Sequence, residues 1–129
     1  LSDRPLACNQ VEYHPYLNQD CVLAACRRHG LAFVSYGPLA PGSDLFAEPA
    51  ITGSATAHNR TPAQIVLRWH IQQDSVVAIP RTRNDARIGE NFEVFDFELT
   101  DAEMAAINSL QRRRLRICDN KFSPQWDRD

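Results

Sequence analysis

The stretch that decides the fold is VVAIPRTRNDARIGEN, residues 76–91. Its apolar start predicts a short strand over residues 76–80, and its second half predicts a helix over residues 85–92. Between them, Thr82 can order the turn and Asn84 can cap the helix. A strand, a short loop and a helix in this order make one βα unit, which is typical of parallel α/β folds.

The loop and helix of this unit carry three positive charges, on Arg81, Arg83 and Arg87. Free N–H groups and the dipole at the start of a helix attract anions, and a guanidinium fork matches phosphate oxygens. The stretch is therefore a candidate phosphate site. Taken alone, it also fits an ordinary surface turn with solvated arginines.

Two more strands are expected upstream, over residues 7–13 and 31–36. The second is apolar on both faces, which is typical of a parallel strand buried on both sides. Strands that alternate with helices predict parallel βα units. The expected helices cover residues 19–29, 48–58, 62–71, 85–92 and 101–110.

Polar residues mark where several of these helices begin. Thr61 with Gln64, and Thr100 with Glu103, have the spacing of capping boxes, in which two side chains satisfy backbone N–H groups reciprocally. Asn18 is expected to cap the first helix.

The composition limits the classes of function. A chain of 129 residues with 43% apolar and 23% charged residues is typical of one globular domain. A net charge of −2 supplies no basic field, and no stretch approaches the roughly 20 apolar residues of a membrane span. We therefore expect neither a nucleic-acid partner nor a membrane partner.

The four cysteines form no C-x-x-C pair, so reduced thiols in a cytoplasmic protein are expected. Cys21 and Cys26 fall in an apolar helical pattern and are expected to be partly buried. The chain begins at Leu1, and its one methionine is Met104. We therefore expect a processed, truncated or partial chain.

Ligands of parallel α/β folds gather at the carboxyl ends of the strands. The segments found there are residues 13–16, 36–39 and 81–83. The amide of Gln10 could face the interior and bind a carboxamide, or it could be a buried, satisfied amide. Tyr36 could stack on a flat ring, or it could pack in the core.

No complete catalytic set and no metal site are predicted. The glycines lack the G-x-G-x-x-G spacing of a dinucleotide loop, and the four histidines lack the spacing of zinc ligands. Tyr13 and Tyr36 have no obvious partner that would lower their pKa values. The basic run 112–116 fits either a solvated helix end and tail or a contact with an anion or a nucleic acid.

Several motifs resemble those of the aldo-keto reductases, in particular the bacterial 2,5-diketogluconate reductase-like branch. They are NQVEYHPY (9–16), YGPL (36–39), TPAQIVLRW (61–69) and the run from IPR to ENFEVFDFEL (79–99). They follow in the family's order over about residues 7–110. The resemblance implies a partial (β/α)8 TIM barrel, namely its last three βα units with the C-terminal helix and loop. Residues 1–129 would then be the C-terminal part of a single NADP-dependent oxidoreductase domain.

The resemblance also implies a role for four residues near the nicotinamide. Gln10 resembles the amide that holds the nicotinamide carboxamide. Tyr36 resembles the aromatic that stacks on the nicotinamide ring. Gly37 and Leu39 fall where the family's loop passes the pyrophosphate.

At the other end of the cofactor, Arg81, Thr82 and Arg87 fall on positions that grip the 2′-phosphate of the adenosine. Glu90 and Asn91 match residues that contact the adenine. Because the family often has lysine at position 81, the arginine keeps the charge but changes its geometry. The resemblance therefore favours NADP(H) as the cofactor.

Aldo-keto reductases reduce aldehydes and ketones with NADPH, so a small carbonyl substrate is implied. The family's catalytic Tyr, Lys, Asp and His lie upstream of the matched region. No catalytic residue is therefore assigned, and the isolated chain is expected to be inactive. The alternatives are a truncated, non-catalytic remnant, or an interaction protein that uses residues 112–116, with weak or no NADP(H) binding.

Three parallel strands cannot close a barrel, because closure requires strand number and stagger to match. Open sheet edges are therefore expected to favour self-association. Phe122 and Trp126 could reach the substrate pocket, or they could simply pack.

Overall fold

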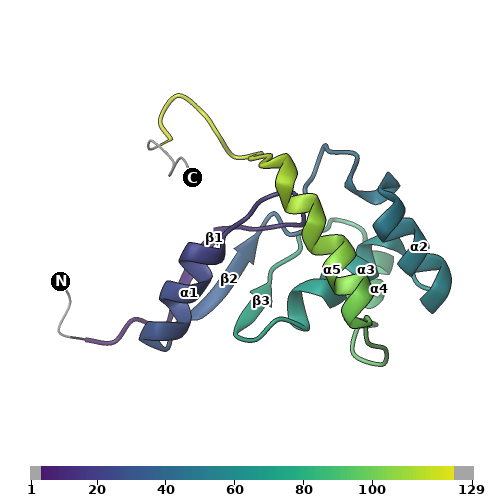
Figure 1. Cartoon of the computed structure of the whole chain (residues 1–129), viewed down its shortest axis with the longest axis horizontal. Helices are drawn as coiled ribbons and strands as arrows, with labels where there is room; N and C mark the ends of the chain where they lie inside the picture. Colours follow the sequence, from purple (N-terminus) through teal and green to yellow (C-terminus); the bar gives the residue numbers. More distant parts are fainter. Residues whose placement is uncertain (1–3, 124–129) are drawn as a thin grey trace.

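A computed structural model describes residues 4–123. Their strands form one parallel sheet in the order β1-β2-β3 (Figure 1): β1 (Cys8–Glu12), β2 (Ala32–Tyr36) and β3 (Val76–Ala78). The register pairs Glu12 with Tyr36 and Ser35 with Ala78, so all three strands end at the same edge of the sheet. The predicted parallel βα arrangement is confirmed.

Helices follow each strand, and each predicted helix is present. The last predicted helix ends at Asn108 rather than Leu110 and continues as a 3-10 helix. The third strand ends at Ala78 rather than at the predicted Pro80, although the N–H of Ile79 still bonds the carbonyl of Ser35 at 3.1 Å. The helices are α1 (Asp20–His29), η1 (Leu45–Ala47), α2 (Pro49–His58), α3 (Pro62–Ile71), α4 (Asp85–Phe92), α5 (Asp101–Asn108) and η2 (Ser109–Arg113).

The capping predictions are confirmed at α3 and α5. Both threonines accept a bond from the third helical N–H, and Gln64 and Glu103 bond back to the cap N–H. The prediction at α1 is wrong in detail. Gln19 occupies the cap position, and Asn18 lies one residue before it and accepts from the N–H of Asp20 at 2.9 Å.

The core lies between the sheet and the helices. Tyr13 packs edge-on against Phe33 and tilted against Trp69, with ring centroids 5.1 Å apart in both pairs. Ile65 and Ile107 are fully buried in the same cluster, which joins α3 and α5 to the sheet. This cluster fixes the strands from one side and so positions their carboxyl ends.

The second face of β2 is only partly covered. Phe33 and Ser35 are buried, but the alternate residues Val34 and Tyr36 are only partly buried. The prediction of a strand buried on both sides is therefore wrong for the part of the chain that the structure describes. Burial on both sides requires elements on both faces, and the described helices supply one side of the core.

The cysteines differ from the prediction at one position. Cys26 is buried in the core, but Cys21 is exposed on α1. Within residues 4–123, no helix combines the length and the apolar character that a membrane crossing needs.

Candidate functional site

The carboxyl ends of the three strands form a continuous rim. The N–H of Tyr13 donates to the carbonyl of Tyr36 at 3.3 Å, and the N–H of Ile79 donates to the carbonyl of Ser35 at 3.1 Å. These bonds extend the pairing just past the ends of the strands. The residues predicted to bind a cofactor from β1, β2 and the turn after β3 therefore lie at one edge.

The two residues predicted near a nicotinamide ring both remain accessible. Gln10 is exposed on β1, so the alternative of a buried, satisfied amide is wrong. Tyr36 is half-buried at the end of β2. Burial, together with the nearby Cys118 thiol and Glu12 carboxylate, raises the pKa of the Tyr36 hydroxyl. Tyr36 is therefore a neutral aromatic surface at physiological pH.

The turn after β2 is tight. Gly37 has a φ of 61°, which favours glycine, and its carbonyl accepts from the N–H of Ala40 at 3.0 Å. Leu39 is partly buried and packs against the core cluster. The turn therefore carries Gly37 and Leu39 directly beside Tyr36 at the rim.

The turn after β3 has the predicted order. The Thr82 hydroxyl accepts from the N–H of Asn84, and the Asn84 side chain accepts from the N–H of Ala86, both at 3.0 Å. Arg81 and Arg87 are exposed and form no ion pair within residues 4–123. Two uncompensated guanidinium groups therefore stand beside the capped start of α4.

The predicted adenine-contacting residues lie near the end of α4. The hydroxyl of Thr61 donates to the carboxylate of Glu90 at 2.6 Å, and Gln64 donates to the Glu90 carbonyl at 3.1 Å. Asn91 is partly buried next to it. Glu90 therefore fastens α4 to the start of α3, and this contact fixes the direction in which α4 leaves the arginine turn.

The other predicted chemical groups are structural. The Tyr13 hydroxyl donates to Gln73 at 2.8 Å, and burial raises the pKa of Tyr13 far above its usual value. Within the described part of the chain, no cluster of three or more His, Cys, Asp or Glu side chains could hold a metal ion. Phe122 is 84% exposed, and Trp126 lies outside the described residues.

The basic run 112–116 is not simply a solvated helix end. Arg113 donates to Asp44 at 2.9 Å and to Glu48 at 2.8 Å, and its guanidinium lies 4.2 Å from the ring centroid of Tyr16. This cluster ties η2 to η1 and to the start of α2.

Sequence reasoning missed a pair of buried ionisable groups at the rim. Glu12 is 2% exposed, and His14 beside it is fully buried. An E-x-H pattern at the end of a strand is a weak signal, because alternate strand residues normally share one face whether or not they interact.

The comparisons with known proteins agree on one family. The profile of the Aldo/keto reductase family matches residues 2–112. An aldo-keto reductase of Mycobacterium sp. (strain MCS) is 51% identical over 104 residues, which are 81% of this chain and 36% of that protein. Aldose reductase B of Dictyostelium discoideum is 42% identical over 113 residues, which are 87% of this chain and 36% of that protein.

Solved structures give the same result. A crystal structure assigned as a 2,5-diketo-D-gluconic acid reductase B has a TM-score of 0.92 and 45% identity, and the match covers 98% of this chain and 45% of that one. A variant of Gox0644 in complex with NADPH has a TM-score of 0.75 and 36% identity, with 81% and 38% covered.

This chain spans little more than a third of the length of the curated relatives it matches. Its three parallel βα units superpose on part of the barrel of the solved structures that it matches. The chain therefore belongs to the aldo/keto reductase family, and its fold is part of a (β/α)8 barrel.

Proposed function

We propose that residues 1–129 form the cofactor-binding part of an NADPH-dependent aldo-keto reductase, the C-terminal part of its single barrel domain. One observation carries the proposal. The accessible aromatic Tyr36 and the uncompensated arginines Arg81 and Arg87 follow adjacent strands at the same edge of the sheet.

The residues present fit a phosphate-bearing dinucleotide. A half-exposed neutral ring offers a face for stacking, and the exposed amide of Gln10 on the first strand can bond a carboxamide. The arginine turn offers guanidinium groups and a helix start to a phosphate. The NADPH complex of a 36% identical neighbour supports the same choice of cofactor.

When bound, NADPH supplies a hydride to a carbonyl carbon of a small aldehyde or ketone. The chain's own residues would bind and orient. Tyr36, Gly37 and Leu39 would position the nicotinamide and the pyrophosphate, Arg81, Thr82 and Arg87 the 2′-phosphate, and Glu90 with Asn91 the adenine.

No tyrosine at this rim is placed to donate the proton that carbonyl reduction needs. Tyr13 is buried and bonded to Gln73, and the pKa values of Tyr13 and Tyr36 are raised. We therefore propose that the proton donor lies outside these residues, and that residues 1–129 alone do not turn over. We also propose that the enzyme is cytoplasmic.

The test is cofactor titration of the intact gene product that carries this sequence. Arg87→Ala should weaken NADPH binding by about 10–100-fold, the value of one charge-assisted contact, and should leave NADH binding nearly unchanged. Arg28→Ala, an exposed arginine at the end of α1, is the matched control. Equal weakening of NADPH and NADH would contradict a contact between Arg87 and the 2′-phosphate. Absence of NADPH binding would favour the remnant interpretation.

A further inference from the structure

The buried carboxylate of Glu12 holds a distant part of the chain. It accepts from the N–H of Ile117 at 2.6 Å, from the N–H of Cys118 at 2.8 Å and from Nε2 of His14 at 2.9 Å. These three donors surround a carboxylate that is 2% exposed and stabilise its charge.

The protonation states follow from this geometry. A carboxylate only accepts, so His14 must carry its proton on Nε2, and burial lowers the pKa of His14. Burial raises the pKa of Glu12. The backbone N–H groups of Ile117 and Cys118, followed by His14, lower this pKa by more, so the net pKa of Glu12 is below its usual value. The site is a carboxylate held mainly by N–H dipoles and a neutral imidazole.

The position of Glu12 connects this contact to the cofactor rim. Glu12 is the last residue of β1 and is paired in register with Tyr36, the last residue of β2. Cys118, which Glu12 holds, is close enough to Tyr36 to perturb the pKa of its hydroxyl. Glu12 therefore fixes one wall of the space around the Tyr36 ring.

A second contact fixes the same segment further back. The N–H of Leu115 donates to the carbonyl of Tyr16 at 3.0 Å, and Arg113 lies over the Tyr16 ring. This contact keeps residues 113–115 near the sheet but does not reach Tyr36. The two hydrogen bonds to the Glu12 carboxylate join residues 117–118 to β1, the strand that neighbours Tyr36.

We infer that Glu12 is a positioning residue for the cofactor site. It holds residues 117–118 against the side of Tyr36, so that the ring keeps one orientation and one free face for a nicotinamide. The inference rests on the proposed function. It adds a residue on β1, outside the contact set proposed for the cofactor itself.

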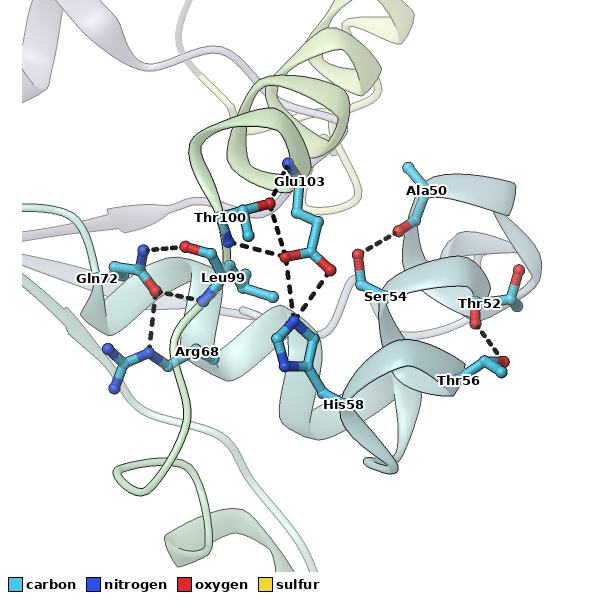
Figure 2. Close-up of polar contacts among 10 residues, drawn as sticks. All are labelled: Ala50, Thr52, Ser54, Thr56, His58, Arg68, Gln72, Leu99, Thr100 and Glu103. Carbon is cyan, nitrogen blue, oxygen red and sulfur yellow. Dashed lines mark hydrogen bonds and ion pairs between the residues drawn. The ribbon is translucent and has the colours of Figure 1, made fainter.

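The chain offers a matched control in Glu103. Its carboxylate likewise accepts from a backbone N–H, that of Thr100 at 2.8 Å, and from a histidine, His58, at 3.0 Å. Figure 2 shows this second carboxylate at the start of α5, facing α2 and surrounded by helices. Both glutamates accept from a backbone N–H and from a histidine, but Glu12 lies at the end of β1 beside Tyr36, whereas Glu103 lies in α5.

The experiment compares Glu12→Gln with Glu103→Gln in the intact gene product. An amide cannot accept at both of its ends, so Glu12→Gln loses at least one of the N–H bonds that reach its two oxygens. In Glu103→Gln, one amide oxygen in the place of Oε2 can keep the bonds from Thr100 and His58. Glu12→Gln should raise the Kd for NADPH by about tenfold, and Glu103→Gln should leave it within about twofold. Amide exchange at Ile117 and Cys118 should speed up in Glu12→Gln only.

Glu12→Asp is the second variant, in case the amide prevents folding. Aspartate keeps the charge but is one methylene shorter, so amide exchange at either Ile117 or Cys118 should speed up. The affinity for NADPH should lie between that of the wild type and that of Glu12→Gln. KM for NADPH and kcat, determined separately, distinguish positioning from stability. A loss of folded protein lowers apparent kcat without changing KM, whereas a displaced Tyr36 ring should raise KM for NADPH.

Two results would overturn the inference. In the first, exchange at Ile117 and Cys118 is unchanged in Glu12→Gln. In the second, exchange rises but NADPH affinity matches that of Glu103→Gln, which would make Glu12 merely structural. Failure of the wild type to bind NADPH would instead overturn the proposed function, and with it the cofactor role of Glu12, whatever the exchange data show.

Discussion

The helical layer and the margin of the sheet differ in how many of their groups find partners within this chain. In the helical layer, formed by α2, α3 and α5, polar groups meet across the helices. His58 bonds Glu103, and Gln72 bonds the backbone of Leu99 (Figure 2). Trp69 bonds Asn108 in the same layer. At the sheet margin, defined as Leu6, Val77 and Ile79, apolar side chains are 43–63% exposed.

This difference shows which contacts the chain completes internally. In the helical layer both partners of each pair belong to this chain, although they are distant in sequence: His58 and Glu103 are 45 residues apart, and Trp69 and Asn108 are 39 residues apart. At the sheet, β1 and β3 each have β2 as their described partner, so each has one edge that no described strand covers, whereas every strand of a closed barrel has two neighbours. The sheet margin is therefore where this chain needs a further element, from a longer chain or from another copy.

The first prediction tests the strength of the helical layer. Trp69 is fully buried, and its indole N–H donates to Asn108 at 2.8 Å. Trp69→Ala should lower the free energy of unfolding by about 3–5 kcal/mol, measured by chemical denaturation. Phe95→Ala removes an aromatic ring that is 69% exposed and should stay within about 0.5 kcal/mol. Similar losses in the two variants would contradict the comparison.

The second prediction concerns acid sensitivity. Burial lowers the pKa of His70 to about 4, against the opposing effect of the Val66 and Tyr13 carbonyls. Between pH 6.5 and 4 the unfolded chain binds a proton that the folded chain excludes, so stability should fall as the pH falls. The loss should approach ~3 kcal/mol, and His14, whose pKa is also lowered, acts in the same direction.

Urea denaturation at several pH values measures this slope. His29→Gln, at the exposed end of α1, should leave the slope unchanged. A stability that stays flat from pH 6.5 to 4 would show that the core around His70 opens to water.

The sequence predicted the local features well. The capping boxes at Thr61 and Thr100 place α3 and α5, because a cap depends on residues three positions apart. The turn at Thr82 and Asn84 formed as expected for the same reason. Apolar runs placed the strands to within two residues.

The contacts that could not be predicted join residues that are remote in sequence. The carboxylate of Glu12 bonds residues 105 and 106 positions away, and Arg113 bonds Asp44 across 69 positions. No local pattern encodes such pairs, since they follow from how the elements pack. The contacts between the rim residues and the cofactor remain predictions, and they come from the resemblance to the aldo-keto reductases.

The third prediction tests a single polar contact of the helical layer. Gln72 donates to the Leu99 carbonyl at 2.7 Å and accepts from the Leu99 N–H at 2.9 Å. Gln72→Ala leaves both groups without these partners and should cost about 1–3 kcal/mol. Thr56→Ala removes an exposed hydroxyl that bonds within α2 at 3.0 Å and should change stability by less than about 0.5 kcal/mol. Equal costs would mean that water replaces the Gln72 contact.

The fourth prediction has the smallest effect on stability but acts on the sheet margin itself. Residues 1–129 alone should self-associate, because the β3 edge presents unpaired backbone groups beside half-exposed Val77. Val77→Lys should shift sedimentation towards the monomer and change stability by less than about 0.5 kcal/mol. Thr52→Lys adds the same charge on the exposed face of α2 and should leave association unchanged. A wild-type chain that is monomeric and unfolds in one cooperative step would show that three βα units complete a stable sheet without a further element.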